Sequence, residues 1–247
     1  MPEATRTGVF IDGQNITIGA GYAFGGGPHA GNMHPLLLAR ALIEPGDQLV
    51  ETRYVTGIPA EDVDPERHES QRRRHDLMAA TDVVVLERPL RYRWEWSIRD
   101  RDRGDPRDQK GEVTKARVKS RHVGQEKGID VWLALDALSM CARDDIDKVI
   151  IATADADLDM VPRYLRTFPA QEGTTVVQAR VLGDGKDLWT NDAYDDTIAI
   201  DRDVYEKAKD DFDYRDPLDE DDVAAFVRRI GVDTDGMRDP GTGEVTT

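Results

Sequence analysis

The sequence contains one cysteine, Cys141, which excludes an intrachain disulfide and a zinc site built from cysteines. Cys141 falls inside a predicted helix, where we expect it to be a buried apolar residue. No apolar run approaches the length of a membrane span, and the first residues lack the charged and then apolar pattern of a secretion signal. From these absences we expect a soluble protein in the reducing cytoplasm.

Basic residues are in the minority. The chain has 33 Lys and Arg against 49 Asp and Glu, which gives a formal net charge of −16. Because contacts to phosphates need Lys and Arg, this balance argues against nucleic-acid binding over the whole surface. A local basic patch or a metal-bridged substrate stays compatible with it. With 247 residues, 39% of them hydrophobic, the chain is long enough for one large α/β domain with an appendage.

Three aspartates follow a predicted buried strand. The strand is the β-branched run Val149 to Ala152, and Asp155, Asp157 and Asp159 come after it at alternate positions. Carboxylates crowded together raise each other's pKa unless a cation neutralises them. Oxygen ligands at this density suit Mg²⁺ or Mn²⁺. Helix capping is the alternative explanation, above all for Asp159 alone.

A second apolar run, residues 8–11, ends at Asp12, and Asn15 follows one helical turn later. An Asx turn with a helix cap is the alternative explanation here. Alternating strands and helices predict a mostly parallel sheet with helices on both faces. Ligands bind such a sheet beyond the carboxyl ends of its strands, where the strand order reverses, so Asp12 and Asp155 converge if their strands are neighbours there. That pocket would hold one or two divalent ions, the arrangement that catalyses phosphoryl displacement.

A predicted helix precedes the strand that leads to Asp155. Asp130 lies in its first turn, and Asp136 lies roughly 120° further around the helix, so we rank Asp130 above Asp136 as a ligand. Lys127 lies about one turn before Asp130 on the same side. Helical spacing predicts the side that faces the core, namely Val131, Leu135, Leu138 and Ala142.

Residues 88–127 are basic, with 13 Lys and Arg against 7 Asp and Glu. Basic and aromatic residues alternate near the start of this insertion, at Arg91, Tyr92, Arg93, Trp94 and Trp96. The period of two predicts an extended strand, with residues 113–118 as its hairpin partner. Interleaved Arg and aromatic side chains suit single-stranded nucleic acid, where bases stack and phosphates pair. An insertion whose aromatics pack on the domain is an equal alternative.

The remaining segments complete a domain over residues 7–200. We predict a glycine-rich loop near the site over 19–34, and we take His68 and His75 as surface residues on a helix with a solvated charged face. Further predicted helices are 36–43, 65–80, 160–168 and 186–193, and further strands are 49–56, 83–86, 174–182 and 197–200. We expect an acidic helical appendage over 201–230 and a disordered tail over 231–247.

Three motifs together resemble the NYN domain family, which belongs to the PIN-like superfamily of metal-dependent ribonucleases. They are Phe10 to Asn15, Lys127 to Val131 with Asp136, and Thr153 to Leu158. The resemblance covers about residues 7–200. It implies a Rossmann-like fold with a central parallel sheet, Mg²⁺ or Mn²⁺ held by acidic residues, and endonucleolytic cleavage of RNA.

Carried over by position, the resemblance implies that the metal-binding and catalytic acids are Asp12, Asp130, Asp155 and Asp157. Asn15 then belongs to the first motif, and Lys127 and Asp136 to the second. The third motif departs from the family pattern, because Leu158 stands where Phe is usual. The proline that usually follows closely comes later, at Pro162, with Asp159 intervening.

These observations favour a metal-dependent endoribonuclease that acts on RNA, expected to be single-stranded, and that uses no covalent intermediate. A non-catalytic RNA-binding module that retains the acidic pocket is the alternative. A phosphatase of the haloacid dehalogenase type is disfavoured, because Asp12 is followed by Gly13 and Gln14 rather than by the second aspartate of that motif. A homo-oligomer is compatible with the sequence, and no membrane partner is expected.

Overall fold

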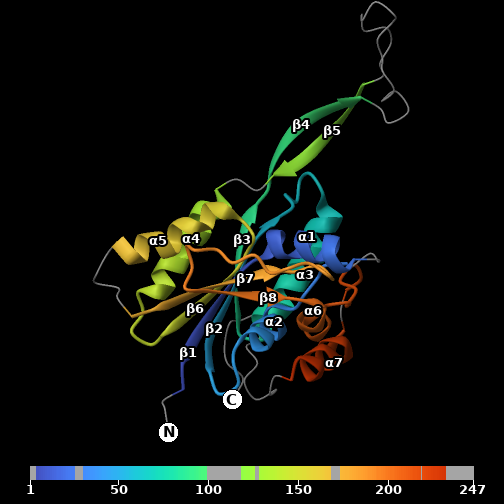
Figure 1. Ribbon diagram of the computed structural model, residues 1–247. Helices are drawn as coiled ribbons and strands as arrows, with labels where there is room; N and C mark the ends of the chain where they lie inside the picture. The colour runs from blue at the N-terminus through green and yellow to red at the C-terminus, as the bar shows by residue number, and fades with distance from the viewer. Residues whose placement is uncertain are drawn as a thin grey trace, which may run out of the picture.

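The computed structural model describes residues 4–25, 30–98, 118–125, 128–167, 173–217 and 219–231. A six-stranded parallel sheet forms its centre, in the order β3-β2-β1-β6-β7-β8 (Figure 1). Its strands are β1 (Arg6–Asp12), β2 (Gln48–Ile58), β3 (Val83–Pro89), β6 (Lys148–Ala152), β7 (Thr175–Val181) and β8 (Asp196–Ile200). A separate antiparallel hairpin consists of β4 (Arg91–Ile98) and β5 (Val118–Gln125).

Helices lie between the parallel strands, and two more, α6 and α7, follow the last strand. They are α1 (Gly13–Phe24), α2 (Pro35–Leu42), α3 (Pro65–Ala80), α4 (Ile129–Cys141), the short 3-10 helix η2 (Ala156–Asp159), α5 (Met160–Thr167), α6 (Arg202–Ala208) and α7 (Glu220–Ile230). The strand order reverses between β1 and β6, which pair in parallel with Phe10 opposite Ile151. The predicted Rossmann-like parallel sheet is thus confirmed, and the two strands that lead to Asp12 and Asp155 are neighbours at its switch point.

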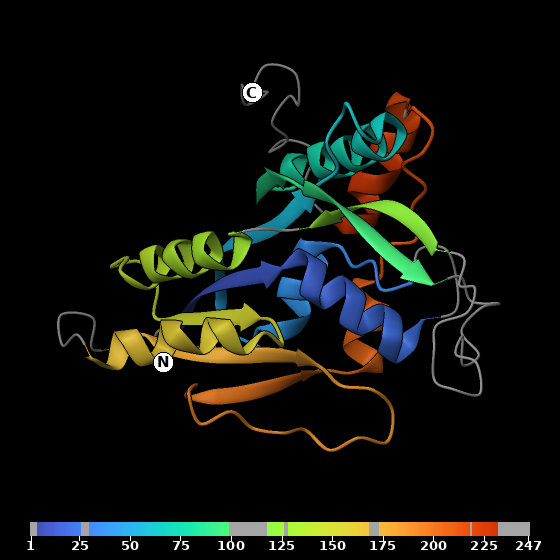
Figure 2. The same cartoon turned by 90° about the horizontal axis from the view of Figure 1, so that it is seen from above.

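Two hydrophobic cores cover the two faces of the sheet. In β1, Val9 and Ile11 face one core, and Phe10 between them faces the other, as the alternation of strand side chains requires. The first core receives buried residues of α1, α2, α3, α6 and α7, whereas the second receives those of α4, η2 and α5. Figures 1 and 2 show this division of the helices. The predicted placement of helices on both faces is confirmed.

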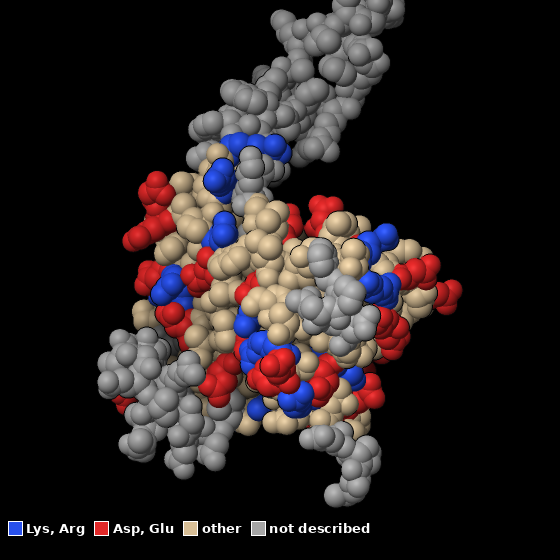
Figure 3. Space-filling view, turned by 90° about the vertical axis from the view of Figure 1, so that its left-hand side faces the viewer, with Lys and Arg blue, Asp and Glu red and all other residues tan. Residues whose placement is uncertain are grey.

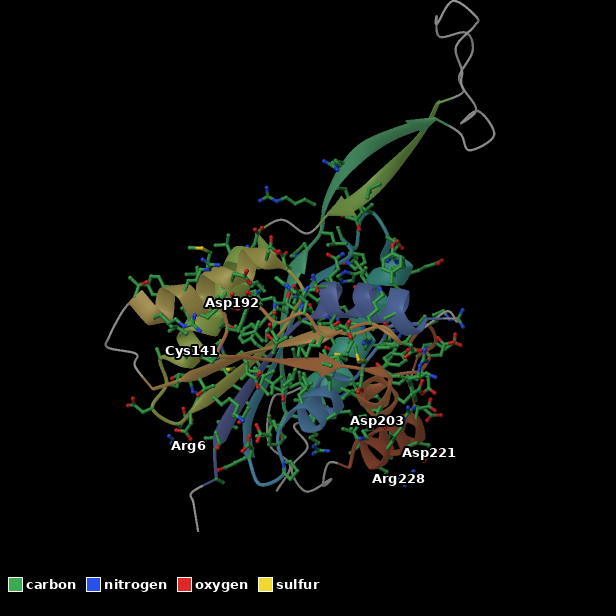
Figure 4. The ribbon with its side chains drawn as sticks, in the orientation of Figure 1. Arg6, Cys141, Asp192, Asp203, Asp221 and Arg228 are labelled. Atoms are coloured by element: carbon green, nitrogen blue, oxygen red, sulfur yellow. The ribbon has the colours of Figure 1, made fainter. Side chains whose placement is uncertain are left out.

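The buried side of α4 differs from the prediction. Its core residues are Leu133, Ala137, Met140 and Cys141. Val131 and Leu135, which we expected in the core, are 64% and 62% exposed. The helix carries apolar residues all round, so their spacing alone does not select the side that meets the sheet. Cys141, the last residue of α4, is buried as expected (Figure 4).

Two predicted segments are corrected, and a third lies mostly outside the described residues. Residues 19–24 belong to α1 rather than to a loop, because Ile16, Ala20 and Phe24 recur every four residues on its buried side. Within the described residues the partner of β4 is Val118–Gln125, and the rest of the predicted partner, residues 113–117, lies outside the described part of the chain. Residues 186–193 form no helix. Asn191 instead accepts the amide hydrogen of Ala193 with its side chain, a local bond that competes with helix formation.

The charged face of α3 is only partly solvated, contrary to the prediction. His75 is 3% exposed and hydrogen-bonds Glu87 of β3. Arg74 is also buried, and its guanidinium donates to Asp210 over 3.2 Å. His68 is half-buried, with Nδ1 2.7 Å from the carbonyl oxygen of Pro59. These contacts tie α3 to the sheet and to the segment after α6.

The acidic segment after the last strand packs on the domain. Tyr205 of α6 and Phe226 of α7 are buried in the first core. Asp203, Asp221 and Arg228, labelled in Figure 4, lie with α6 and α7 at the end of the body away from the hairpin. The predicted tail, 231–247, lies outside the described residues apart from Gly231. Within the described ranges, no helix has both the length and the apolar character of a membrane span.

Candidate metal centre

Asp12 ends β1 at the switch point of the sheet and caps α1. One carboxylate oxygen accepts a hydrogen bond from the backbone N–H of Asn15 over 3.2 Å, and the other accepts one from the hydroxyl of Thr153 over 3.0 Å. Gly13 follows because Tyr54 packs against its backbone, and a Cβ there would come within 2.4 Å of the Tyr54 ring. These contacts fix the direction of the Asp12 side chain.

The loop after β6 is held against the first turn of α1. The amide oxygen of Asn15 accepts the N–H of Ala154 over 2.8 Å. The N–H of Asp155 donates to the Thr153 hydroxyl, and the Asp155 carboxylate caps η2 by accepting the N–H of Asp157 over 2.9 Å. The two strand ends therefore form one hydrogen-bonded unit, with Asn15 and Thr153 as its cross-links.

Asp130 approaches this unit from the first turn of α4. Gly128 begins the helix with a φ of 75°, a left-handed conformation that favours glycine. One carboxylate oxygen each from Asp130, Asp155 and Asp157 lie within 4.8 Å of one another. Helix α4, the loop after β6 and helix η2 thus bring these carboxylates together.

Burial and the neighbouring carboxylates raise the pKa of two of these acids, Asp12 and Asp130. Burial raises the pKa of Asp12 to about 6, although the Asn15 amide and the Thr153 hydroxyl counteract this, and the charges of Asp155 and Asp130 add to the rise. The pKa of Asp130 is raised as well, first by burial and then by Asp155 and Asp157. Asp12 therefore belongs to the same electrostatic group as the three clustered acids, and a cation among them would relieve the repulsion.

The donor set fits a hard divalent cation. All the converging atoms are carboxylate oxygens, the ligands that Mg²⁺ and Mn²⁺ prefer. Opposite ligands of an octahedral Mg²⁺ are roughly 4.2 Å apart, twice the usual bond length. The three carboxylate oxygens lie within 4.8 Å of one another, so they are close enough to be ligands of one cation.

Three other predicted site residues do not join the cluster: Asp159 and Asp136 bond other partners, and Lys127 is not among the described residues. The Asp159 carboxylate accepts the side-chain N–H of Asn191 over 2.8 Å, in the connection between β7 and β8. Asp136 forms an ion pair with Arg53 of β2. Lys127 lies outside the described residues. Sequence reasoning missed Thr153, although a hydroxyl residue between a buried strand and Asp155 is itself a signal for a positioning role.

An open cleft of about 570 Å³ lies over the acidic cluster. Its lining residues are Asp12, Gln14, Asn15, Ile18, Gly19, Val123, Gly124, Asp130, Ala154 and Asp155. Val123 and Gly124 come from β5, so the base of the hairpin forms one border of the cleft. Figure 3 shows Lys and Arg side chains where the hairpin joins the body, whereas acidic and basic side chains are interspersed over the rest of that face.

The hairpin carries the predicted basic and aromatic residues. Arg91 and Arg93 are exposed on β4. Trp94 and Trp96 pair through their backbones with His122 and Ser120, and their side chains lie outside the described part. Between the arginines, the Tyr92 hydroxyl accepts the N–H of Ala60 over 3.3 Å, which anchors the base of the hairpin to the body.

A Rossmann-ordered parallel sheet with an aspartate cluster at its switch point fits the PIN-like class of nucleases. The chain belongs to the NYN domain family, whose model matches residues 6–171. That family is PIN-like, and its nucleases are metal-dependent. The chain is also similar to the crystal structure of a protein of unknown function from Vibrio parahaemolyticus. The two share 19% identity with a TM-score of 0.47, and the match covers 82% of this chain and 97% of that one. A comparison with curated proteins finds no match.

Proposed function

We propose that this protein is a metal-dependent endoribonuclease that hydrolyses phosphodiester bonds of single-stranded RNA. The observation that carries the proposal is the convergence of Asp130, Asp155 and Asp157 within 4.8 Å, at a cleft that is lined by Asp130, Asp155 and the base of the basic hairpin. Membership in a nuclease family supports the same reaction class. In this proposal Mg²⁺ or Mn²⁺ is held by Asp12, Asp130, Asp155 and Asp157.

The residues of the chain have distinct tasks in this reaction. The bound ions supply activation of water and neutralisation of the charge that develops on the phosphate. Asp12, with a pKa of about 6, is mostly ionised at neutral pH and available as a ligand. Thr153 and Asn15 are positioning residues, because their hydrogen bonds fix Asp12 and the Asp155 loop. Arg91 and Arg93 pair with phosphates of the strand as it crosses the hairpin, and Trp94 and Trp96 stack on its bases.

A cleavage assay with a matched pair of variants tests this function. We expect a labelled single-stranded RNA to be cut in Mn²⁺ or Mg²⁺ and to stay intact in EDTA. Asp155→Asn should reduce the rate at least about a hundredfold, because it removes a charged ligand from the centre of the cluster. Asp159→Asn is the matched control, since Asp159 bonds Asn191 instead, and it should stay within about threefold of the wild type.

Two results would contradict this function. Cleavage that Asp155→Asn leaves unchanged would remove the cluster from the reaction. RNA binding without cleavage in any metal would replace the nuclease by a non-catalytic binding module that retains the acidic pocket.

A further inference from the structure

A second groove continues the acidic cleft along α1. It is lined by residues of α1 on one side and of β7 and the β7–β8 connection on the other. Asn15, Gly19 and Ala154 line both the cleft and the groove, so the two form one continuous depression. In Figure 2 the hairpin lies to one side of α1 and the β7–β8 connection to the other, so this groove extends the site away from the hairpin.

The exposed face of α1 forms the shared floor. Asn15, Ile18, Gly19 and Tyr22 recur at the spacing of neighbours on one side of a helix. Ile18 is 50% exposed and Tyr22 is 90% exposed. An apolar and aromatic strip therefore leads from the carboxylates into the second groove, without a charged side chain to repel a nucleobase.

The far wall of the groove combines an exposed aromatic ring with basic groups. Trp189 is 65% exposed, and the guanidinium carbon of Arg180 lies 4.9 Å from the centre of its ring. Nη1 of Arg180 is buried and has no hydrogen-bond partner among the described residues. Lys186 is exposed on the same wall, to which Asp187 also contributes. An indole with one side on an arginine and the rest open is a platform for a second planar group.

We propose that this groove holds a nucleotide of the RNA beside the scissile phosphate, with its base stacked on Trp189 and its phosphate paired with Arg180 and Lys186. The proposal rests on the proposed function. Its occupant is a single-stranded nucleotide, because the basic side chains of Arg180 and Lys186 call for an anion, the open indole for a ring, and the continuous floor for a chain that also reaches the acidic cluster. The groove measures about 300 Å³, the small end of ligand pockets, which suits one nucleotide rather than a duplex.

RNA binding in EDTA tests the groove without any cleavage. Fluorescence anisotropy of a labelled single-stranded RNA of about 12 nucleotides gives the affinity of the full chain. We expect Trp189→Ala to weaken binding about tenfold, because a stacked base is lost, and Trp189→Phe to stay within about threefold. Tyr164→Ala is the control, since Tyr164 is 45% exposed on α5 and lines neither depression, and it should bind as the wild type does.

Two further arms separate stacking from charge. Lys186→Ala should lower the slope of log affinity against log salt by about 0.7, the value for one lost phosphate contact on a single strand. An RNA without bases should remove the difference between the wild type and Trp189→Ala.

The inference and the proposed function fail separately. A protein that binds RNA through Trp189 but cuts nothing in Mn²⁺ would keep the groove and overturn the nuclease. A protein that cuts RNA, while Trp189→Ala changes neither affinity nor KM, would keep the nuclease and overturn the groove. Equal losses in Trp189→Ala and Tyr164→Ala, or no RNA binding by the wild type, would also overturn the groove.

Discussion

Asp12 has opposite effects on the stability of the folded chain and on cation binding. It is 7% exposed, and burial raises its pKa from 3.8 to about 6. The unfolded chain therefore loses this proton at lower pH than the folded chain does. Between about pH 4 and pH 6 the free energy of unfolding falls as pH rises, because the folded state retains a buried carboxyl that is costly to ionise. Above pH 6 the charge is present in both states, and a bound cation offsets its cost.

The corresponding prediction concerns the metal-free protein. In EDTA, Asp12→Asn should raise the free energy of unfolding at pH 8 by up to about 3 kcal/mol, which is the value of the pKa shift, and change it little at pH 4. In Mn²⁺ the wild type should be more stable than Asp12→Asn, since the wild type gains binding energy that the variant lacks. Urea titrations at the two pH values provide the measurement. Asp192→Asn, at an exposed aspartate, is the control. If Asp12→Asn were less stable than the wild type at pH 8 in EDTA, the claim that the ionised Asp12 carboxylate destabilises the metal-free fold would be wrong.

At the scale of elements, the sequence predicts most of the sheet and little of the loops. The helix over 65–80 is predicted at its observed bounds, because Pro65 starts it and Asp64 caps it. Asp12 and Asp155 are predicted to converge, because parallel strands place their carboxyl ends at one edge. The cross-links through Asn15 and Thr153 and the groove at Trp189 are not predictable, since they depend on how a loop folds back on α1. The orientation of α4 is missed because its apolar residues surround the helix.

Two leucines on α4 test its observed orientation. Leu133 is 1% exposed and Leu135 is 62% exposed, although they lie two residues apart on the same helix. Leu133→Ala should lower the free energy of unfolding by about 2–5 kcal/mol, the cost of a core cavity. Leu135→Ala should change it by less than about 0.5 kcal/mol. Chemical denaturation of both variants measures the difference, and a larger loss for Leu135→Ala would support the side first predicted from spacing.

At the scale of the whole molecule, a chain with a net charge of −16 is proposed to act on a polyanion. The proposed path of the RNA reconciles the two charges. Basic residues of the hairpin lie on one side of the acidic cleft, and Arg180 with Lys186 lies on the other. At the centre, the carboxylates would repel a phosphate unless cations lie between them. Because both the charge pattern and the family point to bound cations, the metal is the central claim.

One titration tests that claim most directly. Mn²⁺ would be added to the full chain with a circular single-stranded RNA, and bound Mn²⁺ and cleavage would be followed in the same samples, for the wild type, Asp155→Asn and the control Asp159→Asn. We predict that binding and cleavage of the wild type and the control rise over one range of Mn²⁺, and that Asp155→Asn loses both. Opening of the circle would show an internal cut. Cleavage that persists in EDTA, or that Asp155→Asn retains after losing its Mn²⁺, would contradict a metal-dependent nuclease centred on these aspartates.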